Sequence, residues 1–334
     1  MVRGKYPVVS QSEELIEGYS NSEMAIQEVP LVLFGDHTCC VKLIDFPFVV
    51  GADGTKLLKS KVMEAPYLAF ALQYLKPTIV DGKYRRHFGD LMERFISLPP
   101  LAIQRRIAAK LDRLCDIVAK RKDQLSQLNQ LVKSRFVEMF GDPMTNPNGW
   151  PTGRVSDLAK YWNGLTYKPE NVTDTGTIVL RSSNIQGGSL DFADIVRVNI
   201  SAKEKNLVAP GDVLMCSRNG SAALVGKTAI IPKTDERMYF GAFMMILRSE
   251  VPEYLNAFFA TKAFRSQIAC GATSTVNQIT CTMMDNVSLP LPPKDLMREF
   301  AAFVEKVDKL AFAVRKSLES AEKLYRQQLS EAFT

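Results

Sequence analysis

The chain has 334 residues, a mean hydropathy of −0.06 and a formal net charge of +6, a composition typical of a globular protein. It contains no run of about 18 apolar residues and its first residues include no apolar signal-peptide core, so we expect no membrane span and no secretion. The six cysteines form no Cys-x-x-Cys pair and the two histidines are isolated. This pattern excludes a recognisable zinc or disulfide framework and favours reduced thiols in the cytoplasm.

The distribution of charge is more informative than its total. Residues 96–140 carry nine Lys and Arg against four Asp and Glu, whereas the flanking regions are nearly balanced. A basic chain is compatible with nucleic-acid binding but does not establish it. If the flanking regions bind DNA, they must use local patches and polar side chains rather than a uniformly basic face.

Residues 1–97 predict one small α/β domain. Apolar runs bounded by turn-forming residues predict strands, and a longer apolar run predicts a helix. The expected elements are strands over 30–34, 41–45 and 46–50, a helix over 66–75, and a basic loop with interleaved aromatic residues over 80–88.

Residues 98–140 predict one long helix. The sequence Leu98-Pro99-Pro100 ends the preceding structure, because proline is tolerated only in the first turn of a helix. No Gly or Pro follows before Gly141, so about 40 residues at ~1.5 Å each predict a rod of roughly 60 Å.

The same pattern returns in residues 291–334 at a constant offset (291 − 98 = 193) and without a gap. Ten residues recur identically, from Leu98, which returns as Leu291, to Phe140, which returns as Phe333. Such a repeat determines the architecture. It predicts a first domain over 1–97, a long helix over 98–140, a second domain over 141–290 and a second long helix over 291–334.

Apolar residues in both rods recur at alternating steps of three and four, which is typical of a coiled-coil seam. An isolated rod would expose this seam, so we expect the rods to pack against each other, antiparallel if the second domain returns the chain to its start. The alternative is two unrelated amphipathic helices, each on its own domain. The residues expected at the helix–helix interface are Ile107, Leu111, Leu114, Val118, Leu125 and Leu128 in the first rod, and Phe300, Val304, Val307, Val314, Leu318 and Ala321 in the second.

Residues 141–290 predict a second α/β domain. The expected elements are helices over 155–162 and 254–268, and strands over 177–180, 213–216, 229–231 and 240–247. Both domains then share an order of apolar strand, polar tip, further strand, helix and polar loop before Leu-Pro-Pro. The first domain lacks a counterpart of roughly 141–175, so the chain predicts a duplicated unit whose first copy is shortened at its N-terminus.

The sequence contains no recognisable catalytic constellation. The G-x-G-x-x-G, phosphate-loop and G-x-S-x-G patterns are all absent. Asp36 and Asp212 each follow a Gly, which predicts turns with satisfied carboxylates rather than metal ligands. We therefore expect no catalysis, no cofactor and no metal on this chain.

The polar loop tips are the candidate functional residues. Asn and Gln can pair with adenine, Arg with guanine, and Ser and Thr with phosphates or bases. The alternative is solvated loops of similar composition, although the repeat places Tyr84 and Arg85 at the positions of Asn277 and Gln278. The DNA-binding candidates are His37, Thr38, Lys83, Tyr84, Arg85 and Arg86 in the first domain, and Arg181, Ser182, Asn184, Arg218, Asn219, Ser221, Asn277, Gln278 and Thr280 in the second.

The chain resembles the DNA-specificity subunits of type I restriction–modification enzymes. The resemblance rests on residues 98–101 (LPPL), 180–186 (LRSSNIQ), 211–214 (GDVL) and 277–279 (NQI), and covers essentially the whole chain. It implies an α/β (α+β) fold in which two target-recognition domains are separated by two long helices packed as an antiparallel coiled coil.

In function, the resemblance implies a non-catalytic subunit that recognises a bipartite site in double-stranded DNA and takes part in DNA methylation and defence against foreign DNA. It implies two kinds of partner, the methyltransferase (modification) subunits and the restriction/translocase subunits, which would carry S-adenosylmethionine, ATP and Mg. Two other interpretations stay open. One is a coiled-coil scaffold that binds only proteins, and the other is a self-sufficient methyltransferase, which the absent cofactor motifs disfavour.

Overall fold

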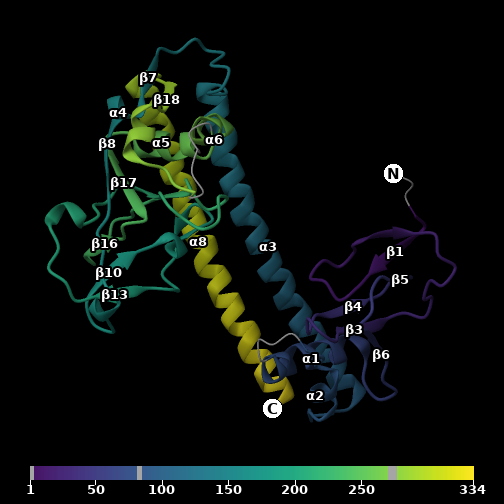
Figure 1. The fold of residues 1–334 in the computed structure, drawn as a ribbon. Helices are drawn as coiled ribbons and strands as arrows, with labels where there is room; N and C mark the ends of the chain where they lie inside the picture. Colours follow the sequence, from purple (N-terminus) through teal and green to yellow (C-terminus); the bar gives the residue numbers. More distant parts are fainter. Residues whose placement is uncertain (1–3, 81–84, 270–276) are drawn as a thin grey trace. The chain divides into compact units, whose positions relative to one another are not determined.

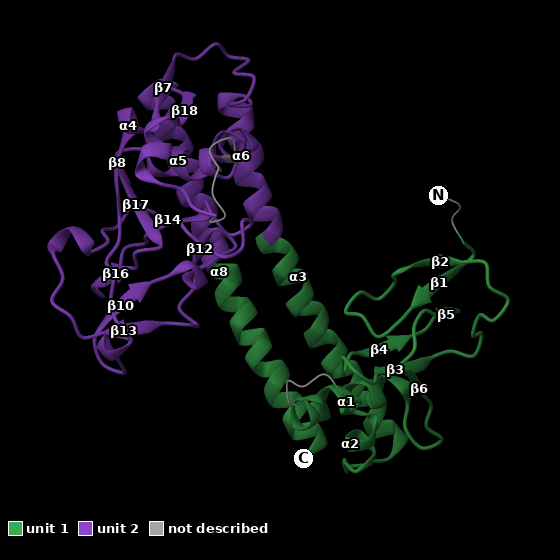
Figure 2. Ribbon diagram, in the orientation of Figure 1, with its two compact units in different colours: residues 1–125, 313–334 green, residues 126–312 purple. Residues whose placement is uncertain are grey.

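The computed structural model describes residues 4–80, 85–269 and 277–334 (Figure 1). The chain divides into two units, Met1–Leu125 with Ala313–Thr334 (unit 1) and Ser126–Phe312 (unit 2), as Figure 2 shows. Each long helix therefore contributes one part to each unit. None of the helices in the described ranges is long and apolar enough to cross a bilayer.

The described residues of unit 1 form two three-stranded sheets. The strands are β1 (Tyr6–Val9), β2 (Gly18–Ser20), β3 (Leu31–Gly35), β4 (Val41–Ile44), β5 (Val49–Val50) and β6 (Thr55–Leu58). One sheet has the antiparallel order β4-β3-β6, and in the other β1 lies between β2 and β5. The fully buried β3 confirms the strand predicted over 30–34, whereas β6 was not predicted.

The helices of unit 1 cover the β3 sheet. Helix α1 (Ala65–Ile79) begins with a proline in its first turn and packs Leu68 and Leu72 against Val32 and Phe34. It confirms the helix predicted over 66–75 and continues one turn further. A short helix, α2 (Phe88–Met92), follows at the end of the basic loop.

In unit 2, the part of the chain that the structure describes forms two four-stranded sheets, with orders β15-β14-β17-β8 and β16-β10-β13-β9, and two small ribbons, β11-β12 and β18-β7. The strands are β7 (Thr152–Arg154), β8 (Ala159–Asn163), β9 (Val172–Thr173), β10 (Thr177–Leu180), β11 (Ile185–Gln186), β12 (Ser189–Leu190), β13 (Val196–Val198), β14 (Val213–Cys216), β15 (Thr228–Ile230), β16 (Met238–Phe240), β17 (Met244–Ser249) and β18 (Ser288–Pro290). The helices and 3₁₀ turns outside the rods are α4 (Val155–Leu158), η1 (Pro169–Asn171), η2 (Ser182–Asn184), η3 (Glu204–Asn206), α5 (Pro252–Phe259), α6 (Lys262–Ala269) and α7 (Cys281–Asp285).

Two predicted elements of unit 2 are wrong in part. The helix expected over 155–162 is α4 followed by β8, because residues 159–163 pair with β17 over five positions. The strand expected over 240–247 is two strands, because the chain changes sheets at Gly241. Strand β16 pairs in parallel with β10, and β17 pairs with β14.

The helix predicted over 254–268 is also two helices. Helix α5 ends at Phe259 and α6 begins at Lys262. The Thr261 hydroxyl donates to the carbonyl oxygen of Phe258 and accepts from the amide of Phe264 at 3.3 Å. This side chain satisfies backbone groups at both helix ends, which stabilises the break.

Helices α3 (Leu101–Phe140) and α8 (Lys294–Phe333) are each 40 residues long and begin 193 positions apart. In unit 1, the Lys110 ammonium donates to the Gln328 side chain, and Lys122 lies 3.1 Å from the Glu322 carboxylate. Residue numbers along α3 increase while those of the contacting residues of α8 decrease, so the two helices are antiparallel.

The same arrangement holds in unit 2. Arg135 lies 3.3 Å from the Glu299 carboxylate, and the rings of Phe136 and Phe300 are 5.7 Å apart, edge to face. All twelve residues predicted at the helix–helix interface are buried or half-buried. The predicted fold, two α+β domains with paired long helices, is confirmed.

Candidate nucleic-acid interface

The candidate site of unit 2 begins where the buried strand β14 ends. The amides of Ser217 and Arg218 both donate to the carbonyl oxygen of Phe243, at 2.9 and 3.1 Å, and the amide of Ile279 donates to the carbonyl oxygen of Ser217 at 2.7 Å. Residues 217–220 are therefore held between the turn after β16 and the loop before α7. Arg218 and Gln278 form an antiparallel bridge at this point.

A further loop, that of Ser182, joins this group through Asn219. Its side-chain amide donates to the Ser182 hydroxyl at 3.0 Å, and its backbone amide donates to the carbonyl oxygen of Asn277 at 3.3 Å. The Asn219 side-chain oxygen accepts from the amide of Ser221 at 3.0 Å, and the Asn277 side-chain amide donates to the carbonyl oxygen of Gly220 at 3.1 Å. Four segments, around residues 182, 217–221, 243 and 277–279, thus converge on one surface.

The exposed groups of this surface are an Arg on an aromatic ring and neighbouring polar side chains. The Arg218 guanidinium lies 5.1 Å from the centre of the Phe243 ring, which is 57% exposed. Gln278 and Ser221 are exposed beside it. An aromatic ring limits the freedom of the guanidinium and leaves its N–H groups for a ligand.

Phe243 was not among the predicted DNA-binding residues, because it lies in the strand predicted over 240–247. The signal that could have identified it is Gly241, two residues before, since glycine inside a strand pattern marks a bend or a close approach. The carbonyl oxygen of Leu180 accepts from the Gly241 amide at 3.0 Å. The chain turns there and exposes Phe243.

The prediction that Asn184 contacts DNA is wrong. Its side chain is fully buried, and its oxygen accepts from the amide of Arg181 at 2.8 Å. Its side-chain nitrogen donates to the carbonyl oxygens of Asp191 and Asp194, at 3.0 and 2.8 Å. The side-chain amide of Asn184 therefore organises the loop and cannot reach a base.

Two other candidates of unit 2 have partners within the chain. The half-buried Arg181 pairs with the Asp194 carboxylate at 2.9 Å. The Thr280 hydroxyl accepts from the amide of Met283 at 3.1 Å and caps helix α7. Arg181 can contact a phosphate only if its guanidinium also keeps, or gives up, the ion pair with Asp194. Thr280 has a structural role as a helix cap.

Unit 1 builds its tip in the same way. The amide of Asp36 donates to the carbonyl oxygen of Gly54 at 2.8 Å, and the amide of His87 donates to the carbonyl oxygen of Asp36 at 2.8 Å. Helices α2 and α7, which follow these contacts, begin 193 residues apart (281 − 88 = 193). The repeat therefore includes the frame of the loop tips.

Two of the described candidates of unit 1, His37 and Thr38, bond to Gln11. The amide of His37 donates to the Gln11 side-chain oxygen at 3.1 Å, and the Thr38 hydroxyl donates to the Gln11 carbonyl oxygen at 2.6 Å. The His37 ring lies 3.2 Å from the carbonyl oxygen of Arg85. Lys83 and Tyr84 lie outside the described residues.

The two arginines of unit 1 are close to carboxylates. Arg85 pairs with Asp90 at 2.6 Å, and the exposed Arg86 lies 3.9 Å from Asp36. The Asp36 carboxylate itself is buried and accepts from the amides of His87 and Phe88. The tip of unit 1 is thus less positive than its sequence suggests.

The turns predicted at Asp36 and Asp212 are confirmed. The buried Asp212 carboxylate accepts two hydrogen bonds from the Arg248 guanidinium, both at 2.7 Å, and one from the amide of Ala209. This pairing raises the pKa of Arg248. Among the described residues, no group of three His, Cys, Asp or Glu could hold a metal ion.

Cys216 lies beneath the tip of unit 2, at the end of β14. Burial raises the pKa of its thiol, so the protonated form is favoured. A protonated, buried thiol is a poor nucleophile. The Cys216 thiol therefore contributes no nucleophile to this tip.

These features define an α+β protein with two repeated sheet units, clustered polar loops and a repeated pair of long antiparallel helices. The family model of the type I restriction modification DNA specificity domain matches residues 147–321, just over half of the chain. The chain belongs to this family.

Individual relatives agree with the family match. The StySPI specificity subunit of Salmonella potsdam, a type I restriction enzyme subunit, is 31% identical over 173 residues, which are 49% of this chain and 36% of that protein. The chain thus spans about a third of the length of that relative. The MjaVIII specificity subunit of Methanocaldococcus jannaschii is 21% identical over 372 residues, covering 96% of this chain and 87% of that protein.

A solved structure shares the fold. The crystal structure of the type I restriction–modification system S subunit from M. genitalium superposes with a TM-score of 0.61 at 13% identity, over 100% of this chain and 90% of that one. At this identity the similarity establishes the architecture alone.

Proposed function

We propose that the chain is the DNA-recognition subunit of a type I restriction–modification complex. It binds double-stranded DNA through its polar loops, directs methyltransferase and restriction/translocase subunits to the site, and catalyses no step itself. The observation that carries this proposal is the convergence of Ser182, Arg218, Asn219, Asn277 and Gln278 on one surface of unit 2. Family membership supports it.

The chemistry of the surface suits base recognition. A Gln amide can pair bidentately with adenine and an Arg guanidinium with guanine, and small hydroxyls contact phosphates. Gln278 and Arg218 stand side by side, and both side chains are exposed. We assign these two residues of unit 2 to direct contact with base edges. We assign the Ser221 hydroxyl to contact with a phosphate of the DNA backbone.

The affinity should come largely from phosphate contacts. Each neutralised phosphate releases bound counterions, so binding weakens as salt increases, while base-edge contacts determine the preferred sequence. S-adenosylmethionine, ATP and Mg belong to the partner subunits in this proposal, and the complex acts in the cytoplasm, where its DNA substrate lies.

The decisive experiment changes Asn277→Ala together with Gln278→Ala in the complex reconstituted with methyltransferase subunits. Methylation-aware sequencing of the modified DNA should reveal an altered base preference in one half-site, with assembly intact. Lys168→Ala, at an exposed ion pair with Glu170 in the same unit, is the matched control and should leave the motif unchanged. An unchanged motif in the double variant would reject the assignment.

We further propose that the paired helices set the spacing between two half-sites. Two recognition units on one face of a duplex bind half-sites separated by multiples of about 10 bp. Inserting two heptads into both α3 and α8 should therefore change the spacer of the methylated motif. A motif with the original spacer would exclude this role.

The same preparations test the two rival functions. A protein-only scaffold predicts no sequence-selective protection of DNA once the partners are present. A self-sufficient methyltransferase predicts methyl transfer to DNA by this chain alone with S-adenosylmethionine. Selective protection that requires the partners would support the proposed function against both.

A further inference from the structure

Arg218 and Arg248 of unit 2 both lie over aromatic rings but differ in their other contacts. The Arg248 guanidinium is 5.2 Å from the centre of the Trp162 ring, and it donates two hydrogen bonds to the buried Asp212 carboxylate. The Arg218 guanidinium is 5.1 Å from the centre of the Phe243 ring, and among the described residues it has no carboxylate partner. Arg248 is therefore committed to the fold, whereas Arg218 and its ring are available to a ligand.

The backbone holds Phe243 in a fixed place at the tip. Its carbonyl oxygen accepts from the amides of Ser217 and Arg218, at 2.9 and 3.1 Å. The next residue, Met244, is buried, and its amide donates to the carbonyl oxygen of Gly241 at 2.8 Å. The Phe243 ring is nevertheless 57% exposed. A ring on a fixed backbone loses little conformational freedom when a ligand covers it, which favours binding.

The contact of Arg218 with guanine determines which atoms of the DNA the ring meets. A guanidinium that donates to both O6 and N7 of a guanine lies in the plane of that base. Successive base pairs are ~3.4 Å apart along the duplex. A ring over the guanidinium therefore faces the major-groove edge of the base pair next to the guanine.

Thymine presents an apolar group on that edge, its C5-methyl group. Cytosine presents an amino donor there, and adenine and guanine present N7 acceptors and further polar atoms. A phenylalanine ring against these polar atoms would leave them without hydrogen-bond partners, which costs free energy. The ring thus favours a T·A pair beside the guanine.

We propose that Phe243 is a specificity-determining residue that contacts the C5-methyl group of a thymine. The thymine belongs to the base pair next to the guanine that Arg218 contacts, so the two side chains together specify adjacent G·C and T·A pairs. This inference rests on the proposed function, since it requires that the tip of unit 2 binds DNA in the major groove.

Unit 1 has no ring at the corresponding position. The Asp36 amide, which follows β3, donates to the carbonyl oxygen of Gly54 at 2.8 Å. The Ser217 amide, which follows β14, donates in the same way to the carbonyl oxygen of Phe243. Gly54 thus takes the place of Phe243, and the methyl contact belongs only to the half-site that unit 2 recognises.

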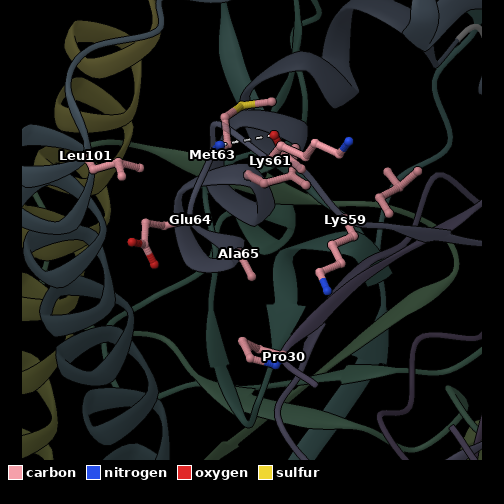
Figure 3. Close-up of a pocket in the computed structure, with 10 residues that line it drawn as sticks. Pro30, Lys59, Lys61, Met63, Glu64, Ala65 and Leu101 are labelled. Carbon is pink, nitrogen blue, oxygen red and sulfur yellow. Dashed lines mark hydrogen bonds between the residues drawn. The ribbon is translucent and has the colours of Figure 1, made fainter. Parts of the chain in front are cut away.

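An exposed apolar side chain elsewhere provides the matched control. Leu101 of unit 1 is 47% exposed and lines a hollow beside Glu64, as Figure 3 shows. The Glu64 carboxylate accepts two hydrogen bonds from the Arg105 guanidinium, at 2.9 and 2.6 Å. This arginine is paired with a carboxylate, and no aromatic ring lines the hollow, so Leu101 should make no contact of this kind.

The test uses the complex reconstituted with methyltransferase subunits, and duplexes that carry the motif found by methylation-aware sequencing. In each duplex, deoxyuridine replaces one thymine of the motif, which removes the C5-methyl group and keeps every pairing atom. We expect one replacement, in a T·A pair next to a G·C pair, to weaken binding about three- to fivefold in a competition assay. The loss corresponds to one methyl group that no longer contacts the ring.

Two variants assign the contact to Phe243. Phe243→Ala should bind the thymine and deoxyuridine duplexes equally, whereas Leu101→Ala should keep the difference that the parent shows. Replacing the adjacent guanine by 7-deazaguanine, which lacks the N7 acceptor, should weaken binding by the parent about fivefold. Arg218→Ala should bind the guanine and 7-deazaguanine duplexes equally.

The outcomes separate this inference from the proposed function. A complex that methylates DNA without any motif would reject the proposed function and the methyl contact with it. The role of Phe243 alone is overturned if the motif has no T·A pair beside a G·C pair, if no deoxyuridine replacement weakens binding there, or if Phe243→Ala keeps the parent's preference for thymine. Loss of that preference in Phe243→Ala, with its retention in Leu101→Ala, would establish the contact.

Discussion

The hydroxyl of Tyr254 donates a hydrogen bond to the carbonyl oxygen of Pro290 at 2.6 Å, and Tyr67 makes the same bond to Ser97 at 2.8 Å. Both acceptors precede a Leu-Pro-Pro sequence. Each tyrosine also packs on the last phenylalanine of a long helix, with ring centres 5.0 Å apart for Phe140 and 4.9 Å apart for Phe333. In each unit, one tyrosine thus joins the start of one rod to the end of the other.

Tyr254→Phe should destabilise unit 2 by about 1–2 kcal/mol, because it leaves the buried carbonyl oxygen of Pro290 without its donor. Urea unfolding followed by fluorescence measures the change. Tyr19→Phe, at an exposed position, should stay within about 0.5 kcal/mol of the parent. Equal stability of both variants would show that the tyrosine bond does not hold the junction.

Phe300→Ala should destabilise the helix pair by about 3–5 kcal/mol, because the ring is fully buried between Phe136 and Phe140. The matched control lies on the same helix. Phe312 is 66% exposed, so Phe312→Ala should cost less than about 1 kcal/mol. A thermal or urea unfolding series on both variants distinguishes packing from helix propensity, and similar losses would contradict the packing argument.

Asp212→Asn should destabilise unit 2 by about 2 kcal/mol, because it removes one member of a partly buried, doubly hydrogen-bonded ion pair with Arg248. The half-exposed guanidinium keeps this below the cost of a fully buried pair. Asp295→Asn, which changes an exposed pair with Arg298, should alter the free energy of unfolding by less than about 0.5 kcal/mol. A similar loss of stability in Asp295→Asn would show that removing any negative charge destabilises the protein, whatever its burial.

Glu253 should make stability depend on pH. Burial raises the pKa of its carboxyl, and Asp308 and Glu305 add to the shift. An acid with a raised folded-state pKa stabilises the fold below its unfolded pKa, and this contribution is lost as pH rises through the folded pKa. The parent should therefore lose stability relative to Glu253→Gln as the pH rises from about 4 to about 7. Urea unfolding of both proteins at the two pH values measures the difference in their free energies of unfolding. If that difference is the same at both pH values, the burial argument is contradicted.

The rods could be predicted from the sequence because their information is local and repeated. Two prolines mark each start, no glycine interrupts the helices, and the apolar seam is broken only by the basic run Lys120-Arg121-Lys122 of the first rod. The 193-residue offset also predicted that each long helix has a partner helix of the same length, which the sequence of one helix alone does not indicate. The structure extends this offset to α2 and α7, which periodicity could not detect because each has only five residues.

The errors have non-local causes. Residues 159–162 were assigned to a helix, but pairing with β17 decides their conformation, and that partner lies more than 80 positions away. Asn184 has the residue type of a base-contacting side chain, yet only the folded loop shows that its amide is fully used. Residue type indicates what a side chain can bind, whereas the fold determines whether it is free to do so.

The equal length of α3 and α8 limits how this architecture can change. Because the helices run antiparallel, residues added to one alone would leave its last turns without an opposing seam and would shift each tyrosine junction from the phenylalanine it now meets. A viable lengthening or shortening therefore has to occur twice, once in each half of the gene, and by the same whole number of heptads.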